Sequence, residues 1–290
     1  METRTTKYDG RQIMLDETTV IPPQLAIDPD DGIIKAWQEG TDAKYVTSYK
    51  ELKNHSLDLP VAIRSMASRK AVRECEATGR DFYYIDTGYI GNRQKRKIYH
   101  RVVKNGMQHS NFVNVPDDRW RTYVESTPGL QYLTFPGWKK DGGPILLVTP
   151  SDKPCKFYGI NRQEWLDTTI ATIKKHTKRP IIIRDKGLRR ERIGNGSIYN
   201  QLDDDNIFAV VTYNSIAATE AIGYGVPAFV SAPNIADMLC EKDLTKIETP
   251  LYSDTTLVEK WQHWVAYCQY TTNEMANGNA YRLIEKYNLS

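Results

Sequence analysis

The segment 209–230 contains residues that could bind a phosphorylated ligand. An apolar run typical of a buried strand leads into the polar turn Tyr213-Asn214-Ser215, and a helix of small residues follows. The first N–H groups of a helix have no partners within the helix and favour negative charge, so this turn predicts a phosphate site. Glu220 lies farther along the helix, where its carboxylate could accept hydrogen bonds from both ribose hydroxyls. The alternative is that Asn214 or Ser215 only caps the helix and that Glu220 is solvated.

A second group of candidates follows the predicted strand 181–183. Arg184 and Lys186 come directly after this apolar run, at the strand end where open α/β sheets place their ligands. Two cations there could neutralise the negative charge of a diphosphate group. A solvated basic loop is the alternative for each of them.

The motif Ser215-Ile-Ala-Ala-Thr-Glu220-Ala-Ile-Gly223-Tyr-Gly225-Val-Pro227 resembles the nucleotide-sugar-binding half of GT-B glycosyltransferases. It is similar in particular to the glycerophosphotransferase and Kdo-transferase type, and the resemblance covers the segment 142–233. It implies two Rossmann-like domains facing a cleft, the donor bound by the second domain, and C-terminal helices crossing back to the first. By this resemblance, Tyr213, Asn214 and Ser215 face the diphosphate and Glu220 faces the ribose. The implied co-substrate is a nucleoside-diphosphate sugar, with UDP as the expected nucleotide, and no cofactor is required.

The first half of the chain offers candidates for the acceptor chemistry. Asp86 follows the predicted strand 82–85, so its carboxylate should face the cleft. An inverting transferase needs a base there to deprotonate the acceptor hydroxyl, and Asp86 is the first candidate and His109 the second. If the reaction is retaining, Asp86 serves only in binding, and a turn-capping role is the alternative. Arg64 follows the predicted strand 61–63 and could bind an anionic group of the acceptor.

A basic segment with aromatic neighbours suggests nucleic acid as the acceptor. Phosphates require Lys and Arg, while an unstacked base requires aromatic surfaces. An enzyme that modifies a base in duplex DNA must also flip it into a pocket. By a further resemblance to phage DNA glycosyltransferases, double-stranded DNA is an expected partner; a solvated basic face is the alternative. The residues assigned to this role are Arg93, Lys95, Arg96, Lys97, Tyr99, Arg101 and Lys104.

The sequence predicts no metal site. Its four cysteines are far apart and form no CxxC pair, which argues against zinc and against a disulfide framework. The run Asp203-Asp204-Asp205 fits the Asp-x-Asp metal motif, but it precedes a predicted strand rather than ending one.

The elements that must position these residues alternate between strands and helices, which predicts an α/β fold with crossover units on parallel sheets. We expect strands at 61–63, 82–85, 98–103, 144–148, 181–183, 208–211 and 228–230, and helices at 68–77, 161–176 and 215–223. The first thirty residues are expected to form an irregular lead-in or an edge strand, and 87–140 mostly loops. The expected domains are an acceptor-binding domain at 1–140, a nucleotide-sugar-binding domain at 141–256, and two amphipathic helices at 257–290 that pack back on the first domain.

The composition agrees with such an enzyme but does not identify its substrate. The net charge of +3 is small, and no apolar stretch is long enough for a membrane span, so we expect a protein without membrane insertion in the cytoplasm, or in the host cytoplasm if it is phage-encoded. The leading hypothesis is a hexosyl- or pentosyltransferase whose preferred acceptor is hydroxymethylated cytosine in DNA. The alternatives are a transferase acting on a cell-envelope polysaccharide or teichoic-acid-like polymer, and a non-catalytic nucleic-acid-binding protein on a transferase scaffold.

Overall fold

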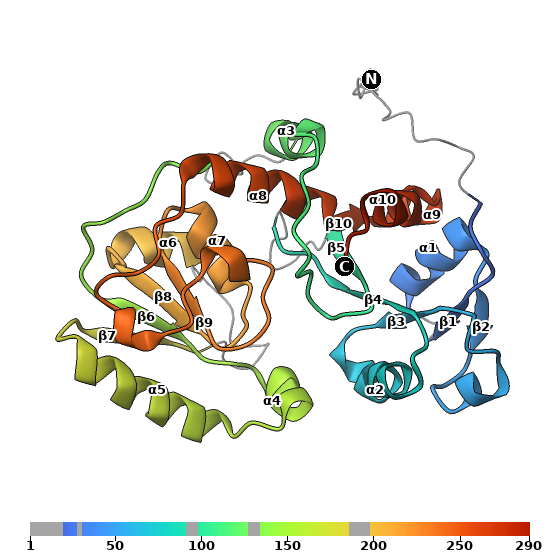
Figure 1. The fold of residues 1–290 in the computed structure, drawn as a ribbon, viewed down its shortest axis with the longest axis horizontal. Coiled ribbons are helices and arrows are strands. Elements are labelled where there is room, and N and C mark those ends of the chain that lie inside the picture. The colour runs from blue at the N-terminus through green and yellow to red at the C-terminus, as the bar shows by residue number, and fades with distance from the viewer. Residues whose placement is uncertain (1–19, 28–30, 91–97, 127–133, 186–197) are drawn as a thin grey trace, which may run out of the picture.

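The computed structural model describes residues 20–27, 31–90, 98–126, 134–185 and 198–290. Within them the chain forms two β-sheets with helices on both faces, joined by a long C-terminal helix (Figure 1). The first sheet has the strand order β10-β5-β4-β3-β1-β2, and the second has the order β7-β6-β8-β9. Strands alternating with helices therefore produce two α/β units, as the sequence predicts.

The first sheet contains four parallel strands, β1 (Leu25–Ile27), β2 (Lys44–Val46), β3 (Val61–Arg64) and β4 (Phe82–Thr87). Strand β5 (Tyr99–Lys104) pairs antiparallel with β4. The strands predicted from the segments near 61, 82 and 98 are confirmed. The description of the first thirty residues as a lead-in or edge strand is wrong for β1, which lies inside the sheet between β2 and β3. A three-residue strand is too short to show the alternation that identifies a longer one.

Three helices accompany this sheet: α1 (Gly32–Thr41), α2 (Arg69–Thr78) and α3 (Asp118–Ser126). Helix α1 begins where Asp31 accepts a hydrogen bond from the Ile33 amide, and α2 ends at Gly79, whose positive φ suits glycine. A core cluster that includes Ile63, Val72 and Cys75 lies between the sheet and α2. The stretch 87–140, expected to consist mostly of loops with a strand at 98–103, contains that strand as β5 and also the helix α3, which was not predicted.

The second sheet is entirely parallel and consists of β6 (Ile145–Val148), β7 (Ile181–Arg184), β8 (Ala209–Thr212) and β9 (Ala228–Val230). Its helices are α4 (Asp152–Tyr158), α5 (Arg162–His176), α6 (Ile198–Asp204) and α7 (Ala217–Gly223). Helix α5 begins after Asn161, whose side chain accepts hydrogen bonds from the Gln163 and Glu164 amides. Alternate residues of β6 enter different cores, as expected for a strand covered on both faces.

The C-terminal segment crosses back from the second sheet to the first, as the fold prediction requires. It contains α8 (Thr255–Tyr267), β10 (Gln269–Thr271), α9 (Thr272–Ala276) and α10 (Asn279–Tyr287). Strand β10 pairs antiparallel with β5 and so extends the first sheet. Figure 1 shows α8 running above the second unit toward the first, where α9 and α10 lie near α1. The sequence predicts two helices in this segment, whereas the structure has three helices and a strand.

The buried side chain of Arg119, on α3, fixes this returning segment. It donates hydrogen bonds to the carbonyl oxygens of Ala266 and Gln269, and it pairs with the Glu274 carboxylate. Its guanidinium also lies against the Tyr267 and Tyr270 rings. A buried charge is tolerated because every partner it needs is supplied.

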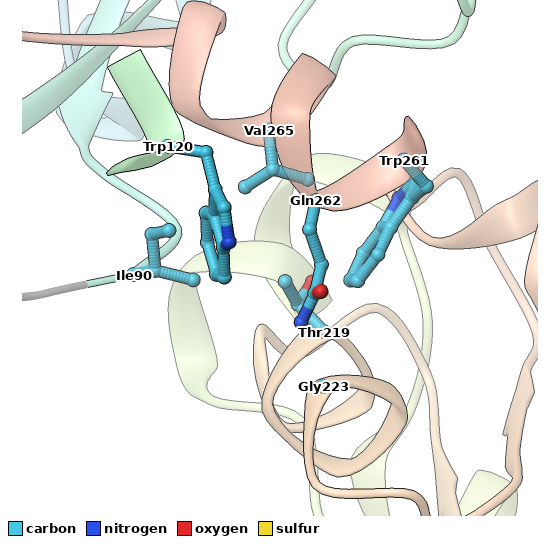
Figure 2. Close-up of a pocket in the computed structure, with 7 residues that line it drawn as sticks. All are labelled: Ile90, Trp120, Thr219, Gly223, Trp261, Gln262 and Val265. Carbon is cyan, nitrogen blue, oxygen red and sulfur yellow. The ribbon is translucent and has the colours of Figure 1, made fainter. Parts of the chain in front are cut away.

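A small cavity marks the junction of the two units, where α3, α7 and α8 meet (Figure 2). Its walls include Trp120 from α3, Thr219 from α7, and Trp261 and Gln262 from α8. Its volume of about 10 Å³ is enough for one water molecule, so the junction is closely packed. None of the helices in the described residues is both long enough and apolar enough to cross a membrane.

Candidate functional site

The two sheets bring their carboxyl edges together, meaning the edges at which their parallel strands end. Helix α4 follows β6 at the carboxyl edge of the second sheet, and it contacts the turn Met66–Ser68 that follows β3 of the first sheet. Arg73 on α2 donates a hydrogen bond of 2.6 Å to the Phe157 carbonyl oxygen, and Phe157 is part of the first unit's core. Ligands of open α/β sheets bind outside the carboxyl ends of the strands, so the region around α4 is the candidate site.

The carboxyl edge of the first sheet carries a cluster of alternating charges. Arg64 at the end of β3 lies 3.3 Å from one Asp86 carboxylate oxygen, and its Nε lies 3.4 Å from the Asp31 carboxylate. Arg101, which faces Asp86 across the β4–β5 pair, reaches the other Asp86 oxygen at 3.6 Å. The four charges balance, so this cluster can persist although it is largely buried.

Three hydrogen bonds and an ion pair surround the Asp86 carboxylate. In addition to the two arginines, the Tyr84 hydroxyl and the Thr87 amide each donate to it at 2.8 Å. Burial alone would raise the pKa of Asp86, but Arg101, the Tyr84 hydroxyl, the Thr87 amide and Arg64 together lower it. A carboxylate accepts about four hydrogen bonds, and three are made here, while Arg101 lies beside the second oxygen, so these groups restrict the approach of an acceptor hydroxyl to Asp86.

The carboxyl edge of the second sheet carries a different polar group. Thr149, directly after β6, donates a hydrogen bond of 3.2 Å to Asp185, directly after β7. Arg162, the first residue of α5, donates to the Thr149 hydroxyl at 2.9 Å and also pairs with Asp185. These three residues hold the starts of two loops and of α5 in a fixed arrangement.

The turn Tyr213-Asn214-Ser215 lies at this same edge, directly after β8. Asn214 and Ser215 are buried, and the Ser215 hydroxyl accepts a hydrogen bond of 3.3 Å from the Ala217 amide. The Ser215 amide donates to the Thr212 hydroxyl, and Asn234 donates to the Ser215 carbonyl oxygen. The alternative capping role is therefore present for Ser215, since its hydroxyl occupies one N–H group that a phosphate would otherwise use.

Aromatic rings connect this turn to α4. Tyr158 is the last residue of α4, and the centre of its ring lies 5.5 Å from the centre of the Tyr213 ring. The Trp165 ring of α5 also contacts Tyr213, with 6.0 Å between the ring centres. Burial and the neighbouring Tyr213 raise the pKa of Tyr158, while a hydrogen bond with Asn214 and the charge of Arg101 act in the opposite direction. Tyr158 thus lies between the residues of the two carboxyl edges.

Arg184 and Glu220 lie near enough for their charges to interact. Arg184 ends β7 and donates a hydrogen bond of 2.6 Å to the Gln201 side chain on α6. Burial lowers the pKa of Arg184, and the nearby Glu220 carboxylate on α7 opposes this shift. Tyr199 on α6 also lies near Glu220, and burial together with the Glu220 charge raises the pKa of the Tyr199 hydroxyl. Lys186, the remaining donor-site candidate, lies outside the described residues.

His109 occupies a position that does not suit a general base. Its side chain is 0% exposed, its Nδ1 lies 2.9 Å from the Tyr89 hydroxyl, and its ring packs on Trp264. Burial, with Arg101 nearby, lowers the pKa of His109 to about 3. A general base must reach the proton it removes, so the structure corrects this assignment: His109 is a core residue between β5 and α8.

The structure also corrects the assignment of three residues to a DNA-binding face. Arg101 is only 6% exposed and pairs with Asp86, and Lys104 donates two hydrogen bonds to Glu285 on α10. Tyr99 is buried against the Tyr123 ring. The charges of β5 are thus used inside the protein, because the returning C-terminal segment covers a strand that looks exposed in the sequence. The other four candidates, Arg93, Lys95, Arg96 and Lys97, lie outside the described residues.

Several residues of the candidate site were missed from the sequence: Asp31, Thr149, Tyr158, Arg162, Trp165, Asp185 and Asn234. A usable signal existed for three of them, because Thr149 directly follows a predicted strand, Asp185 lies two positions after another, and Arg162 lies at the start of a predicted helix. Tyr158 gave no such signal, since α4 was not predicted. Among the described residues, no group of three or more His, Cys, Asp or Glu side chains is arranged to hold a metal ion.

Comparison with known proteins identifies the fold. No family model matches the sequence, and no curated protein matches it. The chain is similar to the solved structure of a beta Kdo 2,4 transferase, Thermosulfurimonas dismutans KpsC, with a TM-score of 0.52 at 10% identity, covering 86% of this chain and 92% of that one. It is also similar to the beta Kdo 2,7 transferase of that KpsC, with a TM-score of 0.53 at 10% identity, covering 91% and 99%. The predicted α/β, GT-B-like fold is confirmed.

Proposed function

We propose that the protein is a glycosyltransferase that moves a sugar from a nucleotide-activated donor to a hydroxyl of a cell-envelope polysaccharide. The main support for this proposal is that the carboxyl edges of the two sheets, which carry different polar residues, lie next to each other at α4. One edge holds Tyr213, Asn214 and the Thr149 group, and the other holds the Arg64–Asp86 ion pair. The likeness to two Kdo transferases, which extends over most of the chain, supports this acceptor class. The internal pairing of Arg101 and Lys104 removes support from a DNA acceptor.

In the donor half, we assign the nucleotide to the carboxyl edge of the second sheet. Glu220 would accept the ribose hydroxyls, and Arg184 would offset the negative charge that develops on the leaving nucleotide. Tyr213 and Asn214 would contact the phosphate region, and Ser215 would hold the start of α7 through its bond to the Ala217 amide. This arrangement places the departing group against α4, beside the acceptor edge.

In the acceptor half, we assign Asp86 a binding role rather than the role of base. It already accepts three hydrogen bonds, and its two arginine partners help to hold its pKa low, which makes it a weak base. Its carboxylate instead fixes Arg64 at the edge that faces the acceptor. On this assignment, replacing Asp86 by Asn raises the KM for the acceptor more than it lowers kcat. A fall in kcat of about 100-fold or more with an unchanged acceptor KM would show that Asp86 is the base.

The proposed activity can be tested directly. The protein is incubated with a panel of nucleotide-activated sugars and three acceptors: acidic cell-envelope oligosaccharides, teichoic-acid-like oligomers and hydroxymethylated duplex DNA. Mass spectrometry of each acceptor then detects added sugar. Transfer to a saccharide supports the proposal, and transfer to DNA alone contradicts its acceptor half. A protein that binds nucleic acid and transfers no sugar from any donor would be the non-catalytic scaffold.

The donor half is tested by Glu220→Gln. We expect this change to raise the donor KM about tenfold or more and to leave the acceptor KM unchanged, since one charge-assisted contact is worth ~1.5–3 kcal/mol. Glu259→Gln, the same substitution at an exposed position of α8, is the matched control and should match the wild type. Equal donor KM values for the two variants would refute the ribose assignment of Glu220.

A further inference from the structure

A cavity of about 340 Å³ lies on the first unit, outside the group of residues around α4. Among the described residues, its walls come from the ends of three neighbouring parallel strands. Ile27 ends β1, Ser48 and Tyr49 follow β2, and Ser68 to Lys70 follow β3. The cavity therefore opens at the same carboxyl edge as Arg64 and Asp86, displaced toward β2. A volume of this size can hold one sugar unit.

The cavity has a positive charge that the described residues do not neutralise. Arg69 and Lys70 form no ion pair with a carboxylate in the part of the chain that the structure describes. The neighbouring carboxylates have other partners there: Glu74 pairs with Lys53, and Glu51 accepts hydrogen bonds from Thr47. Two adjacent cations beside a cavity favour an anionic ligand.

The remaining walls suit a carbohydrate. The Tyr49 ring forms one side, with the Lys70 ammonium 6.0 Å from its centre, and an aromatic face next to polar groups is a suitable surface for a sugar ring. The Ser68 hydroxyl precedes α2 without forming a capping hydrogen bond, and Ser48 also lines the cavity. Hydroxyl groups of this kind can donate to, or accept from, sugar hydroxyls.

The cavity is also connected to the candidate site along the chain. Arg64 is followed by Ser65 and by the turn Met66–Ser68, whose far end lines the cavity and which also contacts α4. A polymeric acceptor that reaches Arg64 with its reacting end could therefore continue along the sheet edge into the cavity.

We propose that this cavity is an acceptor subsite that binds an anionic sugar unit through Arg69 and Lys70, away from the bond that is formed. The anionic group is a carboxylate or a phosphate. This inference rests on the proposed function for its biological meaning, but equilibrium binding tests it without any transfer reaction. The failure of one can therefore be distinguished from the failure of the other.

The experiment uses the full chain without donor and measures binding of three probes: an oligogalacturonate, an oligo(glycerol phosphate) and neutral maltohexaose. We expect at least one anionic probe to bind more tightly than maltohexaose, with an affinity that falls as salt is added. Arg69→Gln combined with Lys70→Gln should weaken that binding roughly tenfold or more. The control pair Lys174→Gln and Lys175→Gln, on exposed positions of α5, should leave it unchanged.

The comparison of the two anionic probes identifies whether a carboxylate or a phosphate is preferred. Equal binding of maltohexaose and both anionic probes would overturn the proposal, as would wild-type affinity in the Arg69 and Lys70 double variant. Circular dichroism of each variant ensures that a loss of binding is not a loss of folding. If an acceptor for transfer is found, the same double variant should raise its KM and leave kcat and the donor KM unchanged.

Discussion

Asp86 and Arg101 face each other in register across the antiparallel strands β4 and β5, with 3.6 Å between the carboxylate and the guanidinium. Arg101 is almost fully buried, so its charge depends on this partner and on the Thr87 carbonyl oxygen to which it donates. The pair joins an edge of the candidate site to the interior of the first unit. The stability of the first unit and the shape of the acceptor edge are therefore coupled.

We expect Asp86→Asn to destabilise the protein by roughly 3–5 kcal/mol at pH 7, the usual cost of leaving a buried charge unpaired. The folded pKa of Asp86 is lowered, so its contribution is complete above the unfolded pKa of about 3.9 and is lost as pH falls through the folded pKa. Urea unfolding at pH 7 and at acid pH measures both effects. Asp81→Asn, an exposed site at the start of β4, is the control, and equal losses for both variants would contradict the prediction.

His109 should make the protein sensitive to mild acid. Its folded pKa of about 3 lies below the ordinary value of 6.5, so the unfolded chain binds more protons between these values. Stability should then fall by up to ~1.4 kcal/mol for each pH unit below 6.5, and His109 contributes nothing to this dependence at higher pH. The measurement is the unfolding free energy from pH 7 to pH 4. We expect His109→Gln to flatten this slope, and an unchanged slope would show that the histidine is accessible to protons.

Gly225→Ala should be more harmful than an ordinary glycine substitution. Gly225 has φ +82°, and a Cβ there would lie 2.1 Å from the Gly137 carbonyl oxygen. Gly159 also has a positive φ, +67°, but no atom lies within 4 Å of its Cβ position, so Gly159→Ala is the matched control for backbone strain alone. We expect a difference of about 1–3 kcal/mol between the two variants, which measures the overpacking. Thermal and urea unfolding measure this difference. Equal values would show that the Gly137 carbonyl oxygen does not lie against Gly225.

Arg119→Met should release the C-terminal segment from α3. The side chain supports the Ala266 and Gln269 carbonyl oxygens and pairs with Glu274, so its removal leaves a buried carboxylate and costs roughly 3–5 kcal/mol. Limited proteolysis should then cleave the chain near β10 faster than in the wild type. Arg121→Met is the control, because Arg121 lies on the same helix, is exposed, and pairs only with Asp117 in the described residues. Similar proteolysis of both variants would contradict this role of Arg119.

The sequence by itself determined the α/β alternation and the strands near 61, 82, 98, 145, 181, 209 and 228. These features depend on local patterns, since apolar runs, caps and turn residues act within a few positions. It also indicated the residues that directly follow strands, such as Arg64, Asp86 and Arg184. The carboxyl edge of a parallel sheet can be identified from strand order alone.

Only the tertiary structure decided which charges face a ligand and which face each other. Arg101 and Lys104 look like part of an exposed basic strand in the sequence, yet they pair with Asp86 and with Glu285, which is 181 positions from Lys104. The same is true of His109, which packs on Trp264 of α8, and of Tyr158, whose ring contacts the distant residue Tyr213. Pairing between distant segments leaves no periodic signal in the chain, because it depends on the packing of elements whose spacing along the sequence is unrelated to their distance in space.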